Sequence, residues 1–163
     1  MTAMCRLAIS LLLLAFAAHA WAWGQSTNPG NNQSNGQSKD QPADELQSRI
    51  ASARPEDRPA LCIQLAQSQL RIADKLYTDG QAEQARAAVA DVATYSQKAG
   101  NAAIQSRKHM KNVEIAVRKM AEKLRDIKRT LNFEDQPPVE QAIVSLEDVR
   151  TVLLKEMFKK EKK

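Results

Sequence analysis

The chain has 163 residues, with 24 Lys and Arg against 19 Asp and Glu, a net charge of +5, and an aromatic content of only 4 %. This length suits one domain behind an N-terminal signal, and two cysteines are too few for a fold held by disulfides. The positive charge makes acidic partners the first class to weigh, whereas the scarcity of His and Cys leaves little material for catalysis or for a metal site.

The N-terminus has the layout of a secretory signal peptide, which we place at residues 1–22. Arg6 precedes an apolar run from Leu7 to about Ala17, too short to span a bilayer as a helix. Small residues satisfy the cleavage rule at two places, and we favour cleavage after Ala22. We therefore expect an exported protein whose mature chain has no transmembrane segment; a retained membrane anchor is the alternative. The bacterial style of the signal favours the periplasm, with secretion or the cell surface left open.

A polar segment follows the signal. Gly24 to Asp40 contains no bulky apolar residue, so it cannot bury enough surface to offset the entropy of ordering. We predict a flexible linker over residues 23–43 and a folded domain over residues 44–163.

The remainder of the chain is predicted to be all-α. Good helix formers dominate it, and apolar residues recur at helical spacing rather than alternating as in a strand. We expect an antiparallel bundle of four main helices, arranged as two hairpins, behind a short leading helix. The expected helices cover residues 42–53, from about 59 to 79, 81–98, 101–131, and from 137 onward.

The second and third predicted helices form the first hairpin. The second presents an apolar face that includes Cys62 and Ile72, and Gly80 supplies the left-handed cap that ends it. Cys62 on this face is expected to be a small buried hydrophobe, with a dimer-forming or reactive thiol as the alternative.

Part of this hairpin resembles a tetratricopeptide unit. The stretch "LYTDGQAEQARAAVADV" places its packing residues and its turn glycine where that family places them, over about residues 61–98. The family's Trp-x-x-Leu-Gly opening and closing proline are absent, and no second copy follows at its period of about 34 residues. The resemblance implies a surface that binds a peptide or protein. The residues that carry it are Leu76, Gly80, Ala82, Ala85, Val89 and Val92.

The fourth predicted helix carries a heptad seam. Its apolar residues are spaced alternately three and four apart, the pattern that packs one helix along another. Gly100 either separates it from the third helix or is absorbed into one long rod. A turn and two prolines then start the last helix, whose apolar side runs from Val139 to Met157 or Phe158. The seam residues are Met110, Val113, Val117, Met120, Leu124, Ile127 and Leu131.

The excess positive charge lies on this fourth helix. Residues 101–132 hold nine Lys and Arg and three Asp and Glu, a local charge of +6. Lys111, Arg118 and Arg125 are seven residues apart and therefore form a line along the helix. We name the basic stripe, the candidate partner-binding surface, by its residues: Lys108, Lys111, Arg118, Lys119 and Arg125.

The stripe also has a plainer interpretation. Glu114 lies four residues before Arg118, and Asp126 three before Arg129, so these pairs are within helical reach. The face can therefore be a solvated, partly self-paired helix surface. Nucleic acid is the weakest partner, because an exported protein does not normally meet it and no aromatic residues interleave the cations.

The sequence offers few residues that could carry out catalysis or bind a cofactor. Beyond the signal there is one His, one Cys and no Gly-rich phosphate loop, so we predict no catalytic residue, no metal and no cofactor. His109 is expected to be a helix-surface residue rather than a base.

Two functions remain. We expect an exported, non-enzymatic helical module that holds a protein partner along a groove or an edge, and that leaves an exposed apolar patch. The alternative is a charge-driven binder of anionic envelope material through the basic stripe, with binding that weakens as salt rises. Self-association through the heptad seam is a further possibility.

Overall fold

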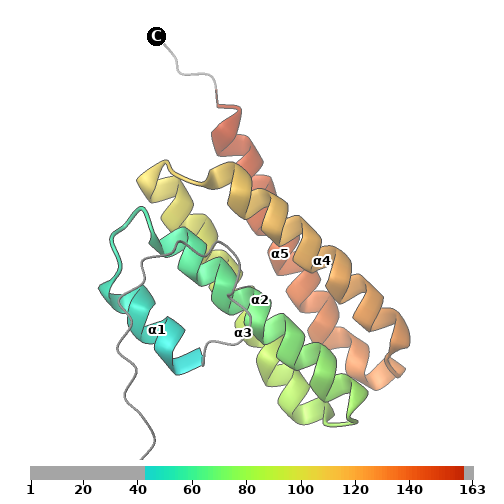
Figure 1. Cartoon of the computed structure of the whole chain (residues 1–163). Helices are drawn as coiled ribbons and strands as arrows, with labels where there is room; N and C mark the ends of the chain where they lie inside the picture. The colour runs from blue at the N-terminus through green and yellow to red at the C-terminus, as the bar shows by residue number, and fades with distance from the viewer. Residues whose placement is uncertain (1–42, 160–163) are drawn as a thin grey trace, which may run out of the picture. The chain divides into compact units, whose positions relative to one another are not determined.

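The computed structural model describes residues 43–159, and this part of the chain is helical without a β-strand (Figure 1). The prediction of an all-α fold is therefore confirmed for these residues. The predicted signal peptide, nearly all of the predicted linker and the last four residues lie outside the described range. The elements are α1 (Ala43–Ser52), α2 (Arg58–Thr78), α3 (Ala82–Ser106), α4 (Met110–Thr130), the 3-10 turn η1 (Phe133–Asp135) and α5 (Gln136–Met157).

Two helical hairpins account for the four long helices. Gly80 has a φ of +73°, so it takes the left-handed conformation that was predicted for it, and the chain reverses there from α2 into α3. The second hairpin joins α4 to α5 through η1. Pro137 and Pro138 lie in the first turn of α5, as predicted, where the missing N–H of proline costs no helical hydrogen bond.

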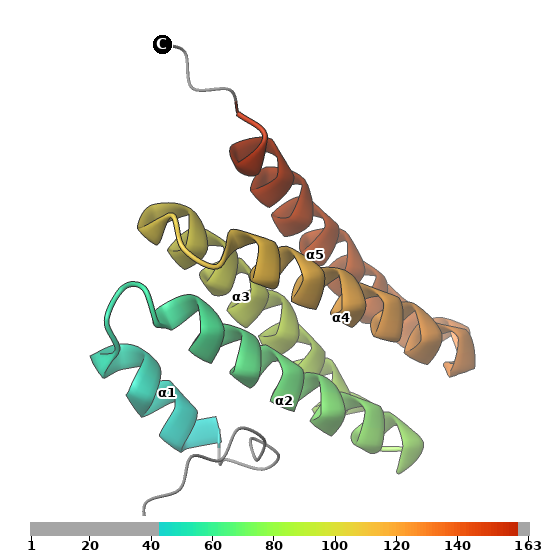
Figure 2. The ribbon, with the colours of Figure 1, turned by 45° about the horizontal axis from the view of Figure 1, so that its top comes forward.

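The hairpins meet mainly through α3 and α5, and these two helices run in the same direction (Figure 2). Arg86 on α3 contacts Asp135, the residue before α5, and Gln97 contacts Ser145 further along both helices. The nearly constant sequence offset requires parallel axes. The predicted antiparallel order therefore describes each hairpin, whereas the contact between the hairpins is parallel.

One continuous apolar core lies among α2, α3, α4 and α5. The central residues of the predicted heptad seam are all within it, so the seam packs inside the chain. These buried seam residues are Val113, Val117, Met120, Leu124 and Ile127. Among the described helices, none is long and apolar enough to cross a membrane.

Gly100 was wrongly predicted as a possible break between two helices. It lies inside α3, which continues for six more residues to Ser106. A Cβ on Gly100 would come within 2.8 Å of Cγ1 of Val149 on α5. The absence of a side chain therefore serves the close approach of α3 to α5.

The break between α3 and α4 lies instead at residues 107–109. Arg107 and His109 have φ angles of 52° and 61°, both in the left-handed region. The two helices are thus separate, and the long rod that the sequence left open does not form. The fourth helix begins at Met110 rather than at 101.

One apolar residue lies outside the core that was predicted to hold it: Ile72 on α2 is 41 % exposed. Of the two alternatives for the end of the apolar side of α5, Met157 is partly buried and Phe158 is 78 % exposed. The expectation for Cys62 is confirmed, since its side chain is buried on α2.

Candidate functional site

The two arginines of the basic stripe are both paired with carboxylates. Arg125 contacts Glu147 of α5 at 2.7 Å, and Arg118 lies 3.8 Å from both Glu114 and Glu122 on its own helix. The neighbouring Lys123 contacts a carboxylate of α2 at 2.8 Å. Much of the positive charge on this helix is therefore used to join it to its neighbours.

These contacts form a network in which the sign of the charge alternates. Glu114 also accepts a hydrogen bond from Arg150 of α5 at 2.9 Å, and Arg150 lies 3.4 Å from Glu147. Because Arg125 binds the same Glu147, cations and carboxylates alternate from Glu122 to Arg125 across the α4–α5 seam. The pKa of Glu147 is lowered chiefly by the Arg125 hydrogen bond, against the effect of burial.

Three lysines of the stripe remain exposed. Lys108, Lys111 and Lys119 form no ion pair with any residue in the range 43–159. Lys108 and Lys111 lie where α4 begins, which is the end of the hairpin at which α5 finishes (Figure 1). The stripe is therefore unpaired at the start of α4, whereas further along Arg118 and Arg125 are paired and Lys119 between them is not.

A groove runs between α3 and α5 on the face where the two hairpins meet. It consists of two hollows, of about 290 Å³ and about 230 Å³, that share Gln97 and Ser145. The side chains of these two residues are hydrogen-bonded at 2.7 Å and bridge the groove near its middle. We call the two hollows together the α3/α5 groove.

Small and apolar side chains line most of this groove. Exposed Val152, at 48 %, lies in its second hollow, and Val144, at 52 % exposed, lies next to Ser145 on α5. Sequence reasoning missed this surface, because it depends on which helix lies beside α3. The main lining residues are Ala90, Ala93, Thr94, Pro138, Ala142, Gly100, Ile104, Val149 and Val152.

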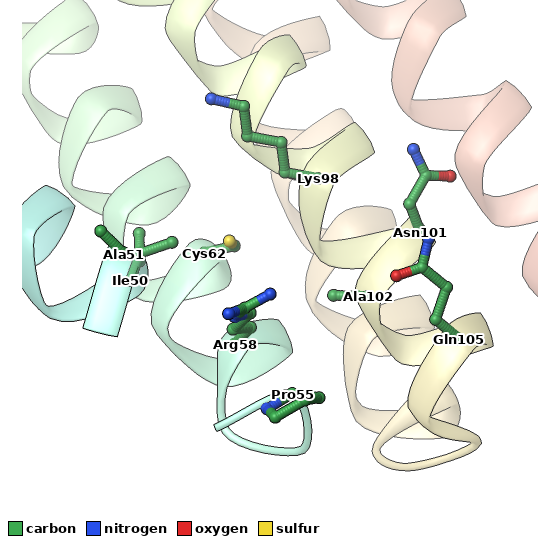
Figure 3. Close-up of a pocket in the computed structure, with 9 residues that line it drawn as sticks. All are labelled: Ile50, Ala51, Pro55, Arg58, Cys62, Lys98, Asn101, Ala102 and Gln105. Atoms are coloured by element: carbon green, nitrogen blue, oxygen red, sulfur yellow. The ribbon is translucent and has the colours of Figure 1, made fainter. Parts of the chain in front are cut away.

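A third hollow, of about 400 Å³, lies beside Cys62 (Figure 3). Arg58 and Cys62 of α2 line it together with Lys98 of α3 and residues at the end of α1. Burial raises the pKa of the Cys62 thiol, while the charges of Lys98 and Arg58 act in the opposite direction. The thiol is therefore protonated near neutral pH, unlike the thiolate of a catalytic cysteine.

His109 and Cys62, neither of which was predicted to be catalytic, lie on different elements. His109 is exposed at the turn before α4, and Cys62 is buried on α2. Within residues 43–159 no group of three or more His, Cys, Asp or Glu is placed to hold a metal ion.

No protein-family model matches the chain, nor does any curated protein or any solved structure. The resemblance of the first hairpin to a tetratricopeptide unit therefore stays a prediction.

Proposed function

We propose that this protein is an exported, non-enzymatic interaction module, and that its α3/α5 groove holds an amphipathic helix of a partner protein. The observation that carries the proposal is a single groove, built from both hairpins and lined mostly by small and apolar side chains, with exposed Val152 inside it. An exposed apolar strip of this kind is the usual docking surface for the apolar face of a helix.

The length of the groove fits a helical partner. Its lining residues on α3 extend from Arg86 to Ile104, which corresponds to about 27 Å at a rise of about 1.5 Å per residue. A partner helix of about five turns would cover this length. The small side chains of Ala90 and Ala93 would let its backbone approach closely.

The groove also favours one orientation of the partner. Because α3 and α5 are parallel, both positive N-terminal poles lie at the end near Pro138 and both negative C-terminal poles lie toward Val152. Asp148 adds a carboxylate to the lining near the second end. A partner helix that runs antiparallel to α3 would place its own positive N-terminal pole near Asp148.

Site-specific photo-cross-linking in the native cell envelope tests this proposal. A photoreactive amino acid is placed at Thr94 or Val152 in the groove, and at Ile72 or Lys119 as exposed control positions. We expect adducts from the two groove positions alone, mapped by mass spectrometry to one segment with an apolar helical face. Equal adducts from Ile72 would contradict the proposal. Adducts joining two copies of this chain would replace it with self-association.

A second candidate is binding to anionic envelope material at the unpaired end of the basic stripe. Lys108 and Lys111 lie at the start of α4, and Lys155 near the end of α5 forms no ion pair with a described residue. Phe158, which is 78 % exposed, adds an apolar contact at the same end. Arg118 and Arg125 drop out of this candidate because carboxylates already bind them.

Salt separates the two candidates. Binding through exposed lysines weakens steeply as ionic strength rises, since the Debye length falls from about 10 Å at 0.1 M to about 3 Å at 1 M. Apolar docking in the α3/α5 groove changes little over the same range.

A further inference from the structure

The hollow beside Cys62 is built from three separate helices. α1 contributes Ile50 and Ala51, the following loop contributes Pro55, and α2 contributes Arg58 and Cys62. Figure 3 shows these residues across from the α3 side chains that complete the lining. The lining from α3 consists of Lys98, Asn101, Ala102 and Gln105.

The charge of this hollow is unbalanced. Arg58 and Lys98 both line it, no Asp or Glu does, and neither cation forms an ion pair with any residue in the range 43–159. This contrasts with the α4–α5 seam, where arginines are matched by carboxylates. Both cations lie close enough to Cys62 for their charges to lower the pKa of its thiol, against the larger effect of burial. An anion in the hollow would be attracted by both.

Both cationic side chains are held by contacts that leave charge available. Nε of Arg58 donates to the backbone oxygen of Ala53 at 3.1 Å, which orients the guanidinium and leaves its two terminal nitrogens for other acceptors. Nζ of Lys98 lies 4.7 Å from the centre of the Tyr95 ring, a contact that uses none of its three N–H donors on an acceptor. Asn101 and Gln105 add neutral amide donors at the edge.

The rest of the lining is apolar. Ile50, Ala51, Pro55 and Ala102 offer carbon surface, and the protonated thiol of Cys62 behaves as a small hydrophobe. A volume of about 400 Å³ is within the range of about 300–1,000 Å³ that small-molecule sites occupy. The hollow thus combines a cationic part with an apolar part.

We propose that this hollow binds a small amphipathic carboxylate, with its carboxylate between Arg58 and Lys98 and its short apolar tail against Ile50 and Ala102. The planar fork of Arg58 suits the two oxygens of a carboxylate. The site lies between α1, α2 and α3 and shares only Asn101 with the α3/α5 groove, so it does not depend on the function proposed for that groove.

Calorimetric titration of the purified protein with octanoate tests the site. Octanol serves as the uncharged probe of similar length, and inorganic phosphate as the anion without a tail. We expect saturable binding of octanoate below ~1 mM, with octanol and phosphate each at least about tenfold weaker. Equal binding of octanol would remove the role of the cations, and equal binding of phosphate would remove that of the tail. Either result would overturn the proposal.

Two variants of the lining and one control variant test whether octanoate binds in this hollow. Lys98→Gln and Arg58→Gln should each weaken octanoate binding about tenfold, because each removes one charge-assisted contact. The matched control is Lys119→Gln, which removes one exposed, unpaired lysine from α4 and should leave the affinity unchanged. Lys98→Gln is the decisive variant, since Arg58 also holds the loop through Ala53. Wild-type affinity in Lys98→Gln would overturn the assignment.

The thiol gives an independent, position-specific readout. Octanoate in the hollow should slow the alkylation of Cys62 by iodoacetamide, and octanol should slow it much less. The octanoate concentration that gives half of the full protection should rise about tenfold in Lys98→Gln and stay unchanged in Lys119→Gln. An alkylation rate of Cys62 that is the same with and without saturating octanoate would show that the ligand binds elsewhere.

Discussion

Arg150 on α5 donates a hydrogen bond from Nε to Oε1 of Glu114 on α4, over 2.9 Å. Glu114 is 9 % exposed, so its carboxylate is nearly withdrawn from water in the seam between the two helices. A buried carboxylate needs a charged or hydrogen-bonding partner, and Arg150 is the one supplied by the neighbouring helix. The Glu114–Arg150 pair therefore fixes how α4 and α5 are aligned.

Replacement of Arg150 by Met should destabilise the fold more than the same replacement of Arg129. Met keeps much of the apolar stem but removes the donor, so Glu114 loses the closest of its cations. Among residues 43–159, Arg129 pairs only with the exposed Asp126 of its own helix, and such surface pairs contribute little. Urea unfolding of the two variants checks this, and equal losses would show that the interhelical pair has no special weight.

The stability should depend on pH through Glu147. Its pKa is lowered in the folded protein, chiefly by the Arg125 hydrogen bond, with burial opposing and Arg150 adding. The lower folded pKa means that this contribution is present above the ordinary Glu value of about 4.3 and is lost as the pH falls through the folded value. Glu147→Gln should therefore be less stable at pH 7, yet lose less stability on acidification.

Urea unfolding at neutral pH and at about pH 3 measures this difference. Exposed Glu56 forms no ion pair with a described residue, so Glu56→Gln is the control and should follow the wild type at both pH values. If Glu147→Gln and the wild type lost the same stability on acidification, the network would not be the source of the dependence.

The effect of Gly100→Ala on stability should depend on the size of the side chain that faces it at position 149. Ala is favoured over Gly inside a helix by about 1 kcal/mol, but its Cβ would overlap Cγ1 of Val149, and such overpacking typically costs about 1–3 kcal/mol. Gly100→Ala should thus lower the free energy of unfolding by up to ~2 kcal/mol. In a Val149→Ala background the same change should raise it by about 1 kcal/mol.

A double-mutant cycle in urea measures both values. A gain in stability from Gly100→Ala alone would mean that α3 and α5 are not held at the distance described.

Substitutions at His109, in the turn before α4, should change stability according to how well the new residue tolerates a positive φ. His109 has a φ of 61°, which disfavours a β-branched residue and suits glycine. His109→Val should lower the free energy of unfolding by about 1–2 kcal/mol, whereas His109→Gly should raise it by up to ~0.5 kcal/mol. Thermal unfolding followed by circular dichroism distinguishes the two. The same sign for both variants would place His109 outside the left-handed region.

The helices could be predicted from the sequence where a local signal marks their ends. Gly80 at the first hairpin turn and Pro137–Pro138 at the start of α5 are such signals, and both were interpreted correctly. The turn between α3 and α4 has none, because Arg107 and His109 take left-handed conformations without glycine. Gly100 was mispredicted because a glycine that ends a helix and a glycine that permits close packing inside one have the same sequence signal. Only the structure shows that Val149 faces it.

The ion pairs within one helix could be predicted from the sequence, whereas those between helices could not. Glu114–Arg118 and Asp126–Arg129 were predicted, since both follow from helical spacing. Arg125–Glu147 and Lys123–Asp74 were not, because they depend on which helix lies beside α4. The α3/α5 groove was missed for that reason as well.

A comparison of two variants tests the central claim, that the α3/α5 groove rather than the basic stripe binds the partner. The groove variant combines Thr94→Arg with Val152→Asp, which place bulk in the first hollow and charge in the second. The stripe variant changes Lys108, Lys111 and Lys119 to Gln. Circular dichroism first establishes that both variants are as helical as the wild type.

The affinity of each variant is then measured for the cross-linked segment of the partner, as a synthetic peptide. If the α3/α5 groove is the binding site, the groove variant should bind the peptide at least about tenfold more weakly, and the stripe variant should bind it with unchanged affinity. Unchanged binding by the groove variant, with the loss in the stripe variant instead, would contradict the account and assign the partner to the exposed lysines of α4.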